Sequence, residues 1–195
     1  MRLIVSEQKN NMQAMIIPGN GNTDISENWF PYAKNALGKL GIRVIAENMP
    51  DPDLARMRYW LPFIEKRLGG DRNAILIGHS SGAVAVLRYL ETHRAEGAVI
   101  VGACHTDLGD EKDKAGGYYE SEWQWDAIKR NVSWIVQFAS IDDPYIPIEE
   151  ARFIKQKLGT EYYEYKNQGH FGADVRKRQF PKLIDAISQK LNKKR

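Results

Sequence analysis

Residues 78–82 read Gly-His-Ser-Ser-Gly and follow a short apolar run, Ile-Leu-Ile, at residues 75–77. A serine with glycines two positions before and two positions after it fits the pattern Gly-x-Ser-x-Gly, and this frame selects Ser80 rather than Ser81. Such a serine sits in a strained turn between a strand and a helix, so its flanking residues need to be nearly bare. The stretch predicts Ser80 as a nucleophile, with the backbone N–H of Ser81 directed at a developing oxyanion.

A serine hydroxyl is a poor nucleophile without a general base, and the sequence contains four histidines. His170 follows a predicted strand at residues 161–165, where its side chain can reach the carboxyl edge of a sheet. His79 lies within the turn and is expected to point away from the site, and His93 is expected at a helix end. We therefore predict His170 as the base, with His105 as the alternative.

The base needs a carboxylate that orients its ring. Asp142 and Asp143 follow a predicted buried strand at residues 134–138. Two adjacent carboxylates repel each other when both are buried, so one is expected to face the site while the other caps the turn or meets solvent. The residues alone leave this choice open, and either choice gives the chain order serine, acid, histidine.

Six segments are expected to form the sheet that positions these side chains. Five are short continuous runs rich in Ile and Val, which is typical of strands buried on both faces of a parallel sheet. The sixth alternates aromatic and charged residues and suits an edge strand. The predicted strands are residues 14–17, 43–46, 74–77, 98–101, 134–138 and 161–165.

Helical patterns fill the intervals between these strands. They cover residues 28–40, 54–68, 82–92 and the C-terminal segment. Pro62 lies inside the second pattern and predicts a kink or a division into two shorter helices. The alternation predicts an α/β fold, a doubly wound and mostly parallel sheet of about six strands. We expect residues 1–12 to form a loose extension and residues 13–195 a single domain.

Residues 104–128 interrupt the alternation with a long polar and aromatic stretch. Loops of this length are usually functional or disordered, and two nearby tryptophans argue against disorder. We expect a short helical insert over one end of the sheet. Tyr118, Trp123 and Trp125 are its candidate substrate-binding residues, and packing of the insert on the core is the alternative role for each.

The Gly-x-Ser-x-Gly turn, Asp-Pro-Tyr-Ile-Pro at residues 143–147 and Gly-His-Phe at residues 169–171 together resemble an α/β-hydrolase. Further segments, among them Pro-Gly-Asn-Gly at residues 18–21, narrow the resemblance to the small serine hydrolases typified by retinoblastoma-binding protein 9. The likeness runs from about residue 15 to the C-terminus. It implies a compact hydrolase core with a minimal lid, formed here by the insert.

The resemblance also implies roles for individual residues. In this superfamily the acid often precedes Val/Ile-Pro, which selects Asp143. The loop after the first core strand supplies the second oxyanion donor, for which we take the Asn20 N–H, with Gly21 as the near alternative. The triad is then Ser80, Asp143 and His170.

The function predicted from these residues is hydrolysis of a small ester or amide, with aminoacyl esters and amides as one option. Asp107, Asp110 and Asp113 are candidates for contact with a substrate amino group. No metal or organic cofactor is implied, since no Cys/His cluster has the spacing of metal ligands. A scaffolding protein on a hydrolase fold, with incidental catalysis, is the alternative.

The composition bounds partners and compartment. The 195 residues carry a net charge of +3, the basic C-terminal tail is expected to be solvated, and the N-terminal apolar run is far too short to span a membrane. We therefore expect no nucleic-acid and no membrane partner, and a monomer. The one cysteine, Cys104, favours a reducing compartment, the cytoplasm, with the nucleus as an alternative. Binding to a retinoblastoma-type pocket uses the motif Leu-x-Cys-x-Glu. Around Cys104, Gly102 stands in place of the leucine and Thr106 in place of the glutamate, so the motif is absent and this partner is unsupported.

Overall fold

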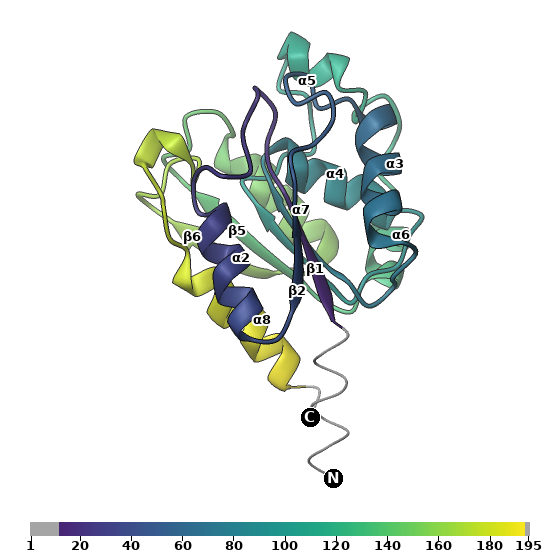
Figure 1. Ribbon diagram of the computed structural model, residues 1–195. Coiled ribbons are helices and arrows are strands. Elements are labelled where there is room, and N and C mark those ends of the chain that lie inside the picture. Colours follow the sequence, from purple (N-terminus) through teal and green to yellow (C-terminus); the bar gives the residue numbers. More distant parts are fainter. Residues whose placement is uncertain (1–11, 194–195) are drawn as a thin grey trace.

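A single six-stranded sheet forms the centre of the computed structural model, which describes residues 12–193 (Figure 1). Every neighbouring pair of strands is parallel, so the predicted α/β class is confirmed and the sheet is wholly parallel. Across the sheet, the order is β2 (Arg43–Ala46), β1 (Gln13–Ile17), β3 (Ile75–His79), β4 (Gly97–Val101), β5 (Ile135–Ser140) and β6 (Glu161–Tyr165). The predicted extension, apart from its last residue, lies outside the described residues, and the single domain stays a prediction.

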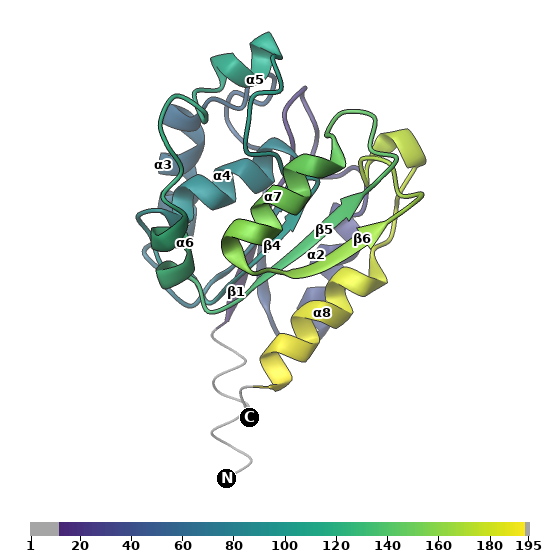
Figure 2. The ribbon, with the colours of Figure 1, turned by 180° about the vertical axis from the view of Figure 1, so that it is seen from behind.

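Helices cover both faces of the sheet (Figure 2). One face carries α2 (Phe30–Lys39) and α8 (Pro181–Asn192), and the other carries α3 (Met57–Leu68), α4 (Ser81–Leu90), α6 (Trp125–Asn131) and α7 (Ile148–Leu158). The short helix α5 (Glu111–Ala115) lies beyond the carboxyl edge of the sheet, as the predicted insert requires. No described helix has the length and apolar character that a membrane span requires.

Alternate side chains of the central strands pack into different cores. In β1, Met15 and Ile17 belong to the core beneath α3 and α4, whereas Ala14 and Ile16 belong to the core beneath α2 and α8. All four are fully buried, which explains the continuous apolar run. The prediction of burial on both faces is wrong for β2, because β2 is an edge strand with Arg43 exposed.

The helix predicted at residues 54–68 is one helix that begins three residues later, at Met57. The division at Pro62 is wrong, since the proline lies inside the continuous helix. The later start has a local cause. Ala55 has a φ of 52°, which no right-handed helix accommodates, and the Asp51 carboxylate accepts the N–H of Arg56 at 3.0 Å.

The order in which strands are added to the sheet reverses at β1. The chain passes from β1 outward to β2, and then returns past β1 to β3 and onward to β6. The loops after β1 and β3 therefore leave adjacent strands at the carboxyl edge, where ligand sites form in such sheets. Both ends of the described chain, residues 12 and 193, lie at the opposite, amino edge (Figure 1).

Candidate active site

Ser80 occupies a strained turn between β3 and α4. Its φ of 55° and ψ of −125° lie in a region that residues other than glycine rarely adopt, at a cost of about 1–3 kcal/mol. Hydrogen bonds hold the turn on both sides. The Ser80 N–H donates to the carbonyl of Val101 at 2.9 Å, and the Ser80 carbonyl accepts the N–H of Ala83 at 2.8 Å. The serine is thus fixed above the edge of the sheet.

The glycines around Ser80 allow strands and helix to approach. A Cβ at Gly82 would lie 2.2 Å from the carbonyl oxygen of Ile17, and one at Gly78 would lie 2.4 Å from the carbonyl oxygen of Gly82. Neither separation is tolerated, because both obstacles are backbone atoms. The requirement for bare flanking residues, inferred from the sequence pattern, has this physical basis.

His170 lies in the loop after β6, and its Nδ1 is 2.8 Å from Oδ2 of Asp143, which follows β5. The other oxygen of Asp143 accepts the N–H groups of Tyr145 at 2.9 Å and Ile146 at 3.0 Å. The imidazole has little room, since a Cβ at Gly102 would lie 3.0 Å from its Cε1. The ring is therefore held by a fixed carboxylate.

Asp142 has a different partner. Its Oδ1 accepts the N–H of Gly169 at 3.0 Å and the hydroxyl of Ser140 at 2.5 Å. The bond from Ser140 holds the pKa of Asp142 below its usual range. The two adjacent carboxylates thus divide as expected, with Asp143 toward the His170 ring and Asp142 on the backbone of the same loop.

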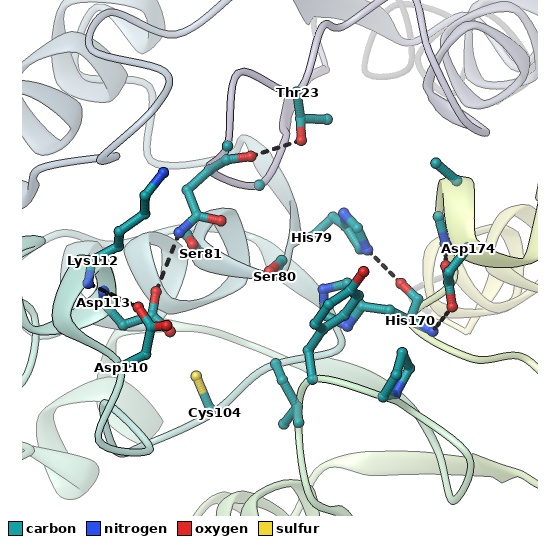
Figure 3. A pocket seen from close by; sticks show the side chains of 18 of the residues that line it. Thr23, His79, Ser80, Ser81, Cys104, Asp110, Lys112, Asp113, His170 and Asp174 are labelled. Carbon is teal, nitrogen blue, oxygen red and sulfur yellow. Dashed lines mark hydrogen bonds between the residues drawn. The ribbon is translucent and has the colours of Figure 1, made fainter.

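His79 lies at the site, contrary to the expectation that it points away. Its side chain is buried, and its Nε2 is 2.7 Å from the carbonyl oxygen of His170 (Figure 3). Burial, aided by the neighbouring imidazole of His170, lowers the pKa of His79 to about 3. His79 is therefore neutral at pH 7, and its Nε2 carries the proton because a carbonyl oxygen only accepts.

The two predicted oxyanion donors, the backbone N–H groups of Ser81 and Asn20, differ in their hydrogen bonding from the near alternative, the N–H of Gly21. Ser81 is the first residue of α4, where an N–H has no acceptor within the helix. The Asn20 N–H makes no hydrogen bond to any residue that the structure describes. The Gly21 N–H, in contrast, donates to the carbonyl of Asp53 at 3.1 Å. Asn20 is thus better suited than Gly21 to bind an added oxygen.

A cavity of about 620 Å³ joins these groups at the carboxyl edge (Figure 3). Its walls include the residues that follow β1, β3 and β6. Among its other lining residues are the apolar Leu108, Pro144, Tyr145 and Ile146 and the acidic Glu27, Asp110, Asp113 and Asp174. The sequence did not predict that either set lines a cavity, although Asp110 and Asp113 were candidates for contact with a substrate amino group.

The three aromatic candidates do not line this cavity. Tyr118 is 3% exposed and packs in the core, and Trp123 stacks on Trp125 with ring centroids 5.1 Å apart. The guanidinium of Arg88 lies 3.7 Å from the centre of the Trp123 ring. The contacts of these residues support the alternative role, in which they pack the insert on the core.

The alternative base, His105, also lies outside the cavity lining. Its ring stacks on Phe153 with centroids 4.0 Å apart, and its backbone N–H donates to Oε2 of Glu150 at 2.7 Å. His93 stacks on Tyr89 at the end of α4. Within the described part of the chain, no group of three or more His, Cys, Asp or Glu side chains is arranged to hold a metal ion.

Comparison with known proteins identifies the family to which this chain belongs. A model of the serine hydrolase family matches residues 14–189, nearly the whole chain. The chain belongs to the serine hydrolase family. This serine hydrolase is 40% identical over 181 residues to serine hydrolase RBBP9 of Rattus norvegicus. The aligned region covers 92% of this chain and 95% of that protein. The chain is therefore an enzyme, a hydrolase.

Solved structures show the fold of this serine hydrolase. The YdeN protein of Bacillus subtilis has a TM-score of 0.85 at 24% identity, with 93% of this chain and 100% of that chain covered. An α/β-hydrolase from a deep-sea metagenome library, MGS-M2, has a TM-score of 0.69 at 12% identity, with 92% of this chain and 88% of that chain covered. The fold is that of the α/β-hydrolases.

Proposed function

We propose that this serine hydrolase cleaves a small ester or amide through a triad of Ser80, His170 and Asp143. The hydrogen bond of 2.8 Å between Asp143 and His170, with Ser80 on the same cavity as His170, carries this proposal. When Nδ1–H donates to Asp143, the lone pair of Nε2 is free to accept the Ser80 proton. Asp143 also stabilises the imidazolium that forms.

The reaction proceeds in two halves. Ser80 Oγ attacks the carbonyl carbon while His170 Nε2 takes the hydroxyl proton, and the Ser81 and Asn20 N–H groups bind the resulting oxyanion. His170 then gives the proton to the leaving alcohol or amine, which leaves an acyl group on Ser80. Water, deprotonated by His170, releases the acid and restores the serine.

The proposed reaction requires Ser80 Oγ to donate a hydrogen bond to His170 Nε2 when substrate is bound. Among the described residues, no hydrogen bond joins Ser80 Oγ to His170 Nε2. In many hydrolases this bond is long or poorly aligned without substrate and tightens in the reacting complex.

A fluorophosphonate probe tests the nucleophile. The serine oxygen displaces fluoride from phosphorus, so the folded wild-type enzyme should be labelled and Ser80→Ala should not. Ser81→Ala is the matched control, because the proposal uses its backbone N–H, and it should label at close to the wild-type rate. Equal labelling of Ser80→Ala, or no labelling of the wild type, would leave the scaffolding alternative.

We propose further that the acyl group carries an ammonium, as in an aminoacyl ester or amide. Asp113 lines the cavity, and its Oδ1 accepts the side-chain N–H of Asn20 at 3.2 Å, close to the proposed oxyanion donor. Burial and the neighbouring charges of Asp110 and Asp107 raise the pKa of Asp113. A cation beside Asp113 relieves this repulsion, whereas an anion increases it.

The matched pair of substrates is an aminoacyl ester and the same ester without its amino group. Asp113→Asn should raise KM for the aminoacyl ester by about 10-fold or more, since hydrogen bonds to charged groups contribute about 1.5–3 kcal/mol. The KM of the ester without the amino group should stay within about 2-fold. Asp126→Asn, on the exposed end of α6, is the control. Equal effects on both esters would contradict the ammonium proposal and leave the triad untouched.

A further inference from the structure

The loop that carries His170 has a strained backbone on both sides of that residue. Gly169 has a φ of 48°, and Phe171 has a φ of 58° although it is not glycine. Left-handed geometry at such a residue costs about 1–3 kcal/mol and persists only where the surroundings enforce it. Phe171 is fully buried, so its side chain anchors one end of the loop. The position of His170 depends on further contacts.

Hydrogen bonds hold both polar groups of the His170 backbone (Figure 3). Its N–H donates to Oδ2 of Asp174 at 2.7 Å, and its carbonyl accepts from Nε2 of His79 at 2.7 Å. Asp174 lies four residues further along the chain, in the short 3-10 helix Ala173–Val175, so it holds the loop only from within the same segment. His79 is the last residue of β3, next to Ser80, so it ties the loop to the strand that carries the nucleophile.

The ring of His79 is itself fixed. It packs edge-on against Trp29 with centroids 6.2 Å apart and lies 5.9 Å from the Phe30 ring. Its Nδ1 is buried without a hydrogen-bond partner among the described residues. An unpaired lone pair at Nδ1 fits the neutral form with its proton on Nε2, whereas a protonated ring would bury an unpaired N–H donor and a charge.

A neutral ring suits its place beside His170. The two imidazole centroids are 4.8 Å apart, and His170 becomes positive when it takes the Ser80 proton. A second positive ring at this distance would oppose that step by charge repulsion. The neutral donor holds the loop without this cost.

We propose that His79 is a positioning residue whose neutral Nε2–H tautomer binds the His170 carbonyl and thereby aligns the His170 ring between Asp143 and Ser80. This inference rests on the proposed role of His170 as the base. It assigns a function to the second residue of the Gly-His-Ser-Ser-Gly turn, which the reaction itself does not use.

Two substitutions separate the hydrogen bond from the packing. His79→Gln keeps an N–H donor at similar reach, and His79→Leu removes it. With a short-chain ester, His79→Leu should lower kcat by about 10–100-fold and leave KM within about 2-fold, because misplacement of a catalytic group by about 1 Å costs on that order. His79→Gln should recover most of the lost kcat. His93→Leu, at the far end of α4, is the control.

A second measurement does not depend on turnover. In nuclear magnetic resonance spectra, the ring N–H signal of His170 at Asp143 should be kept in wild type and His79→Gln, and be lost or shifted in His79→Leu. An unchanged signal and kcat in His79→Leu, or a Gln variant as slow as the Leu variant, would overturn the inference. If the wild type failed to react with fluorophosphonate, the proposed function would fail, and the ring signal would still decide the positioning role.

Discussion

Asp142 and Asp143 carry the same side chain at adjacent positions and meet different partners. Asp143 binds the ring of His170 with one oxygen and two backbone N–H groups with the other. Asp142 binds the Ser140 hydroxyl and the N–H of Gly169. One carboxylate orients the ring, and the other shapes the loop on which the ring is carried.

Substitution by asparagine distinguishes these two roles. Asp143→Asn presents an amide that disturbs the ring tautomer, and kcat should fall by about 10⁴-fold, the loss seen for the equivalent change in serine proteases. Asp142→Asn keeps an oxygen for Gly169, and we expect a loss of less than about 10-fold. Steady-state hydrolysis of a short-chain ester measures both. Similar losses in the two variants would refute the division of roles.

At the scale of residues, the sequence predicted the groups that patterns define. Gly-x-Ser-x-Gly selected Ser80. Which of Asp142 and Asp143 contacts the His170 ring depends on the hydrogen bonds of a turn, and two adjacent identical residues do not reveal these. The location of His79 was missed because its partner, the His170 carbonyl, is 91 positions away. Whether Tyr118 meets the core or the cavity was left open, because composition does not tell which face of an insert meets the core.

At the scale of elements, two helical glycines, Gly82 in α4 and Gly38 in α2, differ sharply in their surroundings. A Cβ at Gly82 would meet the backbone of β1 at 2.2 Å, whereas one at Gly38 in α2 would meet nothing within 4 Å. The first glycine permits close packing, and the second only adds freedom to the unfolded chain.

Alanine substitutions should therefore act in opposite directions. Gly38→Ala should raise the free energy of unfolding by about 0.5–1 kcal/mol, since alanine favours a helix over glycine by about that amount. Gly82→Ala should lower it by several kcal/mol or prevent folding. Urea denaturation measures both, and a Gly82→Ala variant as stable as wild type would contradict the close approach.

Arg88 connects α4 to the insert. This buried side chain donates from Nε to the carbonyl of Tyr118 and from Nη2 to that of Ser121, each at 2.7 Å. It also pairs with Glu91 at 2.7 Å and lies against the Trp123 ring. The helix that follows Ser80 thus also contacts the insert.

Removing this charge should loosen the insert. Arg88→Met keeps the length of the side chain but removes its ion pair with the half-buried Glu91 and its hydrogen bonds to the carbonyls of Tyr118, Ser121 and Glu122. The free energy of unfolding should fall by about 1–3 kcal/mol. Arg130→Met, exposed on α6, should change it by less than about 0.5 kcal/mol. A small effect at Arg88, measured by urea denaturation, would exclude this anchoring role.

The elements themselves were largely predictable because periodicity depends on local sequence. The strands at residues 43–46 and 161–165 match their predicted bounds. The start of α3 was missed because it depends on the hydrogen bond between Asp51 and Arg56, and the side chain of Arg56 also pairs with that carboxylate at 2.8 Å. Such local contacts outweigh helical periodicity at the ends of an element.

At the scale of the whole molecule, His79 makes stability depend on pH. Its pKa is about 3 in the folded protein and 6.5 without burial, so the unfolded chain binds the extra proton between these values. Stability from this group is complete above pH 6.5 and is lost as the pH falls toward 3.

His79→Gln removes this titration. Between pH 7 and pH 4.5 the wild type should lose on the order of 2 kcal/mol more unfolding free energy than the variant, as expected for one proton taken up by the unfolded chain alone. Urea denaturation of both proteins at the two pH values gives this difference, in which any constant effect of the substitution cancels. Equal losses would show that His79 titrates alike in both states.

The α/β class of the whole molecule followed from alternating strand and helix patterns. Strand order does not follow from such patterns, because spacing does not say whether a strand is added to one edge of the sheet or the other. The reversal at β1 brings the loops after β1 and β3 together, and with them Asn20 and Ser80.

The two ends of the described chain lie at the edge of the sheet opposite the cavity (Figure 1). A surface or fusion partner attached at either end of the described chain, residue 12 or residue 193, therefore sits on the far side from Ser80. Immobilised on a bead or electrode, every molecule would present its cavity to the solution. Substrates too bulky for most tethered enzymes would then be limited by the walls of the cavity rather than by the support.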